Sequence, residues 1–162
     1  VRTGTWACGF HGFVGMRNFV METAEGEMLA CAYSEWAYMD PVAGRPVRAD
    51  AGEIQRYGME EPLEMEYAGR KISVPGEQRF LDPVTVHAHH LDSNHHVNNG
   101  QYVAIAAEYL PEGFQVRQLR AEYKRQARLG DILTPGISES SGAYVVTLND
   151  QAGRPYVILE FS

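Results

Sequence analysis

The stretch that decides the fold is HAHHLDSNHHVNNGQYVAIAAEYL, from His87 to Leu110. It predicts a strand, a polar loop and then a helix. The loop, Leu91–Asn99, concentrates acid, base and amide groups at Asp92, Asn94, His95, His96, Asn98 and Asn99. A solvated turn needs far fewer such groups. The loop also precedes a helix, where free backbone N–H groups and the positive end of the helix dipole can stabilise a polarised carbonyl oxygen.

The helix prediction rests on spacing. Asn98 and Asn99 are good N-caps, and Pro111 followed by Gly113 predicts the end of the helix. Between them, apolar residues recur at helical intervals at Tyr102, Val103, Ile105, Ala106, Tyr109 and Leu110. Considered alone, this periodicity is also explained by a capped core helix behind a polar loop.

Other segments predict strands or turns from apolar alternation and breaker residues. The predicted strands are Arg2–His11, Gly12–Glu22, Glu27–Met39, Val84–His89, Phe114–Arg128, Ile132–Ser138, Ala143–Asn149 and Pro155–Phe161. Asp50–Tyr57 predicts a short helix capped by Asp50. Antiparallel strands that curl round one helix make an α+β fold.

Composition predicts an ordinary globular chain, with 44% hydrophobic and 22% charged residues and no apolar run long enough to span a bilayer. The net charge of -7 argues against nonspecific binding to nucleic acid. Cys8 and Cys31 form no disulfide framework or metal spacing, which favours a reducing compartment.

The residues from Asp92 to Asn99, followed by Tyr102, resemble the D-x-N-x-H-V-N-N-x-x-Y signature of acyl-acyl-carrier-protein thioesterases. Further matches to this family are Trp6, Gly9-Phe10, Gly12-Phe13 and Arg17-Asn18-Phe19, with Ser34-Glu35-Trp36 and Arg45-Pro46-Val47 after them. The resemblance implies a hotdog fold, in which an antiparallel sheet wraps a long central helix, as a tandem with an incomplete first domain. It also implies an enzyme that releases fatty acids from acyl carrier protein (ACP) in fatty acid biosynthesis.

We therefore expect residues 1–57 to form a partial N-terminal hotdog domain, 58–80 a linker, and 81–162 a C-terminal hotdog domain that carries the catalytic loop. The linker has the proline, glycine and acidic composition of a solvated connector. Only the second half predicts a long helix, so the first sheet should leave an apolar face uncovered. We expect the natural protein to have residues before Val1.

Thioester hydrolysis needs an activated nucleophile, and no G-x-S-x-G elbow is present. Neither cysteine is close to the histidine loop in sequence, although that alone does not exclude a triad. Water activated by a carboxylate or imidazole is the remaining option. The resemblance assigns catalysis to Asp92 as base or water orienter, Asn94 as positioning amide and His96 as acid/base. Asn98 and Asn99, besides capping, and Tyr102 are candidate substrate-binding residues.

One position departs from the family, whose Y-[RKL]-[RK]-E-[CA] pattern places an acid in the strand after the helix. Here Tyr123-Lys124-Arg125-Gln126-Ala127 has Gln126 at that position, which we carry as a fourth candidate catalytic residue. Glutamine cannot take a proton from water, so a base at this position would leave the protein weak or inactive. With Asp92 as base, Gln126 can still hold a water molecule.

The histidines invite a metal hypothesis, with His87, His89, His90, His95 and His96 all close in sequence. Their spacing is not that of a zinc site, so we predict no metal and no cofactor.

The predicted partner is ACP carrying a fatty acyl chain. ACP is acidic, so a basic patch should receive it, and the candidates are Arg117, Arg120, Lys124, Arg125 and Arg128. A strand with one basic solvent face explains the same residues equally well. Open alternatives are a noncatalytic acyl-binding module, an acyl-coenzyme A thioesterase and a homodimer. The resemblance implies the cytoplasm, or the plastid stroma in a plant.

Overall fold

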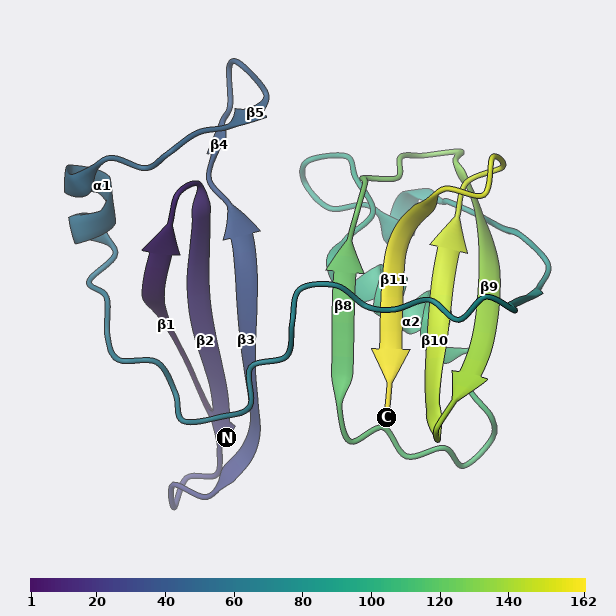
Figure 1. The fold of residues 1–162 in the computed structure, drawn as a ribbon, viewed down its shortest axis with the longest axis horizontal. Coiled ribbons are helices and arrows are strands. Elements are labelled where there is room, and N and C mark those ends of the chain that lie inside the picture. The colour runs from purple at the N-terminus through teal and green to yellow at the C-terminus, as the bar shows by residue number, and fades with distance from the viewer. The chain divides into compact units, whose positions relative to one another are not determined.

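The computed structural model describes all 162 residues, Val1–Ser162, and divides into two compact units, Val1–Ala68 and Gly69–Ser162. The division falls within the segment predicted as a linker. Each unit contains an antiparallel sheet, and helices are few (Figure 1). The predicted α+β class is confirmed, whereas the domain boundaries at residues 57 and 81 stay predictions.

The first unit is built on a three-stranded antiparallel sheet in the order β1 (Arg2–His11), β2 (Val14–Glu22) and β3 (Met28–Ala37). A small hairpin follows, formed by β4 (Met39–Asp40) and β5 (Arg45–Pro46). The predicted short helix is α1 (Ala51–Arg56), and its N-cap is Asp50, whose side chain accepts the Glu53 N–H at 2.9 Å. The strands and the helix predicted in this half are therefore confirmed.

One face of the first sheet is covered by residues 59–68, the first strap. The buried Asn18 amide bonds to this strap: its Oδ1 accepts the Leu63 N–H at 3.1 Å, and its Nδ2 donates to the Tyr67 hydroxyl at 3.0 Å. Trp6 Nε1 donates to the Glu61 carbonyl at 3.0 Å. This face of the sheet is thus covered by a segment without regular secondary structure and not by a helix.

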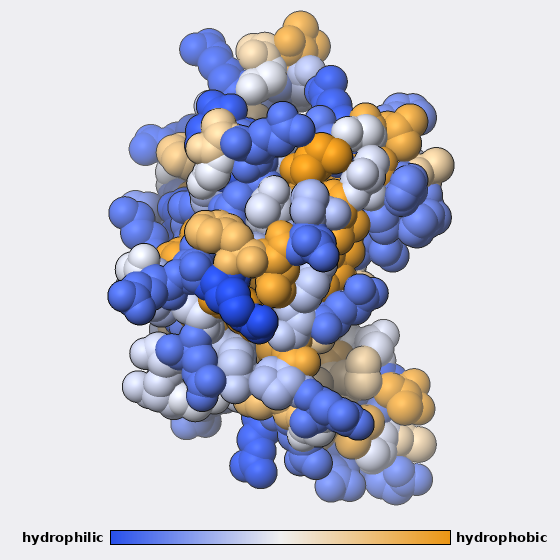
Figure 2. Space-filling model, turned by 90° about the vertical axis from the view of Figure 1, so that its right-hand side faces the viewer, coloured by the Kyte–Doolittle hydropathy of each residue, from blue (hydrophilic) through white to orange (hydrophobic).

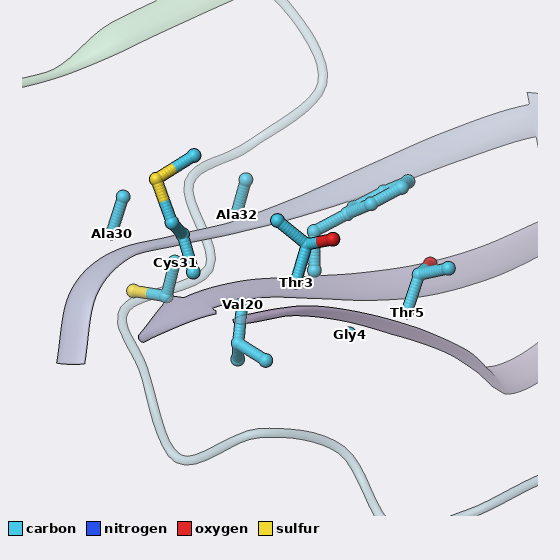
Figure 3. A pocket seen from close by; sticks show the side chains of 9 residues that line it. Thr3, Gly4, Thr5, Val20, Ala30, Cys31 and Ala32 are labelled. Atoms are coloured by element: carbon cyan, nitrogen blue, oxygen red, sulfur yellow. The ribbon is translucent and has the colours of Figure 1, made fainter. Parts of the chain in front are cut away.

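The other face of the first sheet is open. A hollow of about 390 Å³ lies over it (Figure 3), and its lining residues are Thr3, Gly4, Thr5, Phe19, Val20, Met21, Ala30, Cys31 and Ala32. In the register of the sheet, Met21 lies between Thr3 and Ala30, and Phe19 is likewise exposed. The expected uncovered apolar face is present.

The second unit has a larger sheet, in the order β6 (Arg79–Phe80), β9 (Ile132–Ser140), β10 (Ala143–Asn149), β11 (Pro155–Phe161) and β8 (Leu119–Tyr123). A short strand, β7 (Val84–Thr85), also pairs with β9. The helix α2 (Asn99–Ala107) packs against β10 and β11 (Figure 1). The core between helix and sheet includes Tyr102, Ile105, Ala106, Leu133, Val146, Leu148, Val157, Leu159 and Phe161.

A second strap, residues 69–78, crosses the opposite face of this sheet, in front of β8, β11, β10 and β9 in Figure 1. Its Ile72 is 6% exposed and packs with Val145 and Ile158. Arg120 donates to the Gly69 carbonyl at 2.8 Å. Most of this strap is exposed, and Ile72 is the residue through which it packs on the apolar outer face of the sheet. The assignment of residues 58–80 as a linker stays a prediction.

Three predicted elements are shorter than expected. The strand predicted over Val84–His89 ends at Thr85, and Ala88–His90 forms a 3₁₀ turn instead. Strand β8 covers only the middle of Phe114–Arg128, so Gln126 lies beyond the strand that was expected to hold it. The central helix ends at Ala107, and Glu108 caps it. Neither helix has the length and apolar character needed to cross a bilayer.

Large apolar side chains remain on the surface of the second unit. Phe80 and Leu129 are examples, and Figure 2 shows apolar residues gathered among hydrophilic ones on the face that it presents.

Candidate functional site

The polar loop is folded around the carboxylate of Asp92. Its Oδ1 accepts the Asn94 N–H at 2.8 Å and the His96 N–H at 3.3 Å. The Asp92 N–H in turn donates to the His96 carbonyl at 2.8 Å. This is the turn chemistry that aspartate favours, and it occupies one carboxylate oxygen. The other oxygen makes no hydrogen bond within the chain and is available to a water molecule.

The two ends of the loop are joined at a neck. Leu91 and Val97 form an antiparallel bridge, and the Asn98 N–H donates to the His90 carbonyl at 2.9 Å. His95 at the tip adopts a left-handed conformation with φ of 60°. The loop is therefore closed on itself and leads straight into the helix.

The start of α2 is capped by Asn98. Its side chain accepts the Gly100 N–H at 2.8 Å, and its carbonyl accepts the Gln101 N–H at 2.9 Å. The predicted cap is confirmed for Asn98, whereas Asn99 is the first helical residue. The Asn99 N–H donates to no group of the chain, which leaves one free donor at the positive end of the helix.

The segment after β8 meets the loop at Ala127. The Ala127 carbonyl accepts the Val97 N–H at 2.9 Å, and its N–H donates to the Tyr102 hydroxyl at 2.8 Å. Gln126 precedes this double contact, and its exposed amide makes no hydrogen bond within the chain. The fold thus brings the Asp92–His96 loop, the helix start and the Gln126 segment together.

The predicted site residues differ in their burial and in their hydrogen bonds. The Asp92 carboxylate bonds to the backbone of His96, and no hydrogen bond joins it to the His96 ring. The Asn94 side chain is exposed. Tyr102 is buried, and its hydroxyl is taken by Ala127, so the ring is part of the core here. The catalytic and substrate-binding roles of all these residues stay predictions.

Sequence reasoning missed two contributors to this site. His90, which was considered only as a metal candidate, is buried at the neck of the loop. Tyr123 donates its hydroxyl to the Asn99 carbonyl at 3.3 Å. The Tyr123 contact has no local sequence signal, because it depends on how the helix and the strand after it approach each other.

Most of the basic side chains in the predicted docking patch form ion pairs with carboxylates of this chain. Arg120 Nη1 lies 2.8 Å from Glu160 Oε1, and Lys124 Nζ lies 2.6 Å from Glu122 Oε1. Arg125 Nη2 lies 3.0 Å from Asp150 Oδ2, and its guanidinium stands over the Tyr156 ring, 4.4 Å from the ring centroid. Arg117 and Arg128 are exposed and form no ion pair.

This combination defines a hotdog protein, with an antiparallel sheet packed on one helix and a polar loop at the entrance of that helix. Residues 74–156 match the model of the acyl-ACP thioesterase C-terminal domain. Because this match covers more than half of the chain, the protein belongs to the acyl-ACP thioesterase family. None of the curated proteins matches the sequence significantly.

Two solved structures show the same fold. One is an acyl-ACP thioesterase from Bacteroides thetaiotaomicron, with 21% identity, a TM-score of 0.84 and coverage of 98% of this chain. The other is the 12:0-ACP thioesterase from Umbellularia californica, with 18% identity, a TM-score of 0.82 and coverage of 99% of this chain. This chain spans 66% of the length of each of them. At these identities the likeness establishes the fold alone.

Proposed function

We propose that this chain carries the catalytic site of a thioesterase that hydrolyses fatty acyl-ACP to free fatty acid and carrier. The observation that supports this function is the state of the Asp92 carboxylate. Two backbone N–H groups hold one oxygen and the other oxygen is free, and the loop leads into a helix whose first N–H is also free. A base and an oxyanion donor are the two groups that water-mediated thioester hydrolysis requires.

In the proposed reaction, the free oxygen of Asp92 takes a proton from a water molecule. The water oxygen attacks the thioester carbonyl carbon, and the carbonyl oxygen becomes an oxyanion that accepts the Asn99 N–H. The tetrahedral intermediate then collapses and breaks its carbon–sulfur bond. The carrier thiolate leaves and receives the proton that Asp92 took from water, relayed through the His96 imidazole. Both groups thereby return to their starting protonation states, while Asn94 positions the water or the substrate.

Gln126 supports the assignment of the base to Asp92. Its amide is free and stands next to the residue that bonds the loop. An amide can orient a water molecule by hydrogen bonding but cannot accept its proton. The proton must therefore go to another group, and Asp92 is the carboxylate of the loop.

The decisive variant is Asp92→Asn. Asparagine keeps an oxygen that can accept the same two N–H groups, so the loop retains its shape while the base is lost. We expect thiol release from acyl-ACP to fall about 10²- to 10⁴-fold. The matched control is Asp82→Asn, the same change at an exposed carboxylate outside the loop. Equal rates in the two variants would refute Asp92 as the base.

The same assay decides between the alternatives. Release from ACP substrates supports the proposal, and a preference for acyl-coenzyme A supports a coenzyme A thioesterase. Acyl binding without release supports a noncatalytic module, which the glutamine at position 126 favours. ACP docking, if it uses the basic patch, rests on the two unpaired arginines. Arg117→Glu combined with Arg128→Glu should then raise KM for acyl-ACP and leave that for acyl-coenzyme A unchanged.

A further inference from the structure

The neck of the catalytic loop contains a buried histidine that the reaction does not use. His90 is 7% exposed, and its ring Nδ1 accepts the His87 N–H at 3.0 Å. Its backbone carbonyl accepts the N–H of Asn98, the residue that caps α2. The His90 side chain thus closes the 3₁₀ turn before the loop, and its backbone carbonyl fixes the end of the loop.

We propose that His90 is a positioning residue whose neutral ring latches the Asp92–His96 loop, and that protonation of the ring in acid releases the loop. An imidazole accepts a hydrogen bond only through an unprotonated nitrogen. A proton on Nδ1 would oppose the His87 N–H and remove the bond that shapes the turn. The His90 carbonyl also accepts the N–H of Asn98, the residue that caps α2. A change in the conformation of His90 would therefore weaken both the neck of the loop and the cap of the helix. The link to catalysis rests on the proposed function, whereas the latch itself does not.

The surroundings of His90 favour its neutral form. Burial lowers the pKa of the His90 imidazole below its ordinary value, and the charges of His89 and His87 lower it further. The His89 ring centroid is 4.1 Å away and that of His87 is 6.0 Å away, so a charge on all three rings would be repulsive. Glu108, at the end of α2, acts in the opposite direction. The latch should therefore stay closed near neutral pH and open in acid.

Amide exchange measured by NMR tests the latch without any substrate. Protection factors at His87 and Asn98, corrected for intrinsic exchange, should fall as the pH drops from the ordinary imidazole pKa towards the lowered pKa of His90, by at most about tenfold for each pH unit. The His90→Asn variant keeps an acceptor oxygen that does not titrate, so its protection should not change with pH. His89→Asn is the matched control at the exposed neighbour and should keep the acid-induced loss. Protection that does not change with pH in the unmodified chain, or an equal loss in His90→Asn, would overturn the proposal.

A second measurement covers the case in which His90→Asn fails to fold. In the unmodified chain, the His87 amide shift should titrate with the same midpoint as the His90 ring, and different midpoints would overturn the latch. In the thiol-release assay, His90→Asn should move the acid limb of kcat to lower pH, while His89→Asn should not. A chain that releases no thiol at any pH would refute the proposed function, and amide exchange would still decide on the latch.

Discussion

Replacing Tyr102 with Phe removes one oxygen from the core of the second unit. That oxygen accepts the Ala127 N–H at 2.8 Å, and Ala127 is 0% exposed, so water cannot take its place. A buried N–H without a partner destabilises a protein by about 1–3 kcal/mol. We expect urea denaturation to show a loss of about that size in the free energy of unfolding.

Tyr123→Phe is the matched control for this change. The Tyr123 hydroxyl also makes one hydrogen bond, to Asn99, but the residue is 42% exposed. Water can replace the lost partner, so the expected change is within about 0.5 kcal/mol. Tyr102→Phe should also raise amide exchange at Val97, which bonds to the carbonyl of the orphaned residue. Equal losses of stability in the two variants would refute the conclusion that the buried hydrogen bond between Ala127 and Tyr102 stabilises the second unit.

Three further predictions address the strap, the departure from the family and a surface turn. Ile72→Ala should lower the free energy of unfolding by about 2–4 kcal/mol, whereas Val74→Ala, at a residue 36% exposed, should cost much less. Gln126→Glu should change the rate of thiol release, and an unchanged rate would argue against a catalytic role for the position. The Arg154 backbone N–H lowers the pKa of Asp150 to about 2, so its bonds should hold above the ordinary aspartate pKa. They should weaken as the pH falls through about 2, which a carboxyl NMR titration would detect.

Elements with local signals were predictable from the sequence. The Asn98 cap and the apolar spacing after it specify α2, because a cap and a helical face involve residues within a few positions of each other. The same holds for β10 and β11, whose predicted bounds, Ala143–Asn149 and Pro155–Phe161, are the observed ones. Both are apolar runs on either side of the turn at residues 150–153, so the pattern of each run is local.

One prediction of secondary structure failed where a side chain forms a hydrogen bond that the alternation of apolar and polar residues does not indicate. In Val84–His89, the alternating pattern predicts a strand to its end, yet the chain turns after Thr85. The His90 ring accepts a main-chain N–H that a strand would have offered to its neighbour. The burial of Ile72 was also not predictable, since the composition of the strap is that of a connector and only the sheet beneath it explains why this residue is buried.

The candidate site also has features that are local in sequence and features that depend on long-range contacts. The types of its chemical groups could be predicted, because a carboxylate, an imidazole and amides before a capped helix are all local. Their support could not, because Tyr102 reaches a partner 25 residues away. Its place in the signature suggested a contact with substrate, and its helical spacing suggested the core. Only the position of Ala127, bonded to the helix on one side and to the loop on the other, explains how one tyrosine ties the segment after β8 to the loop.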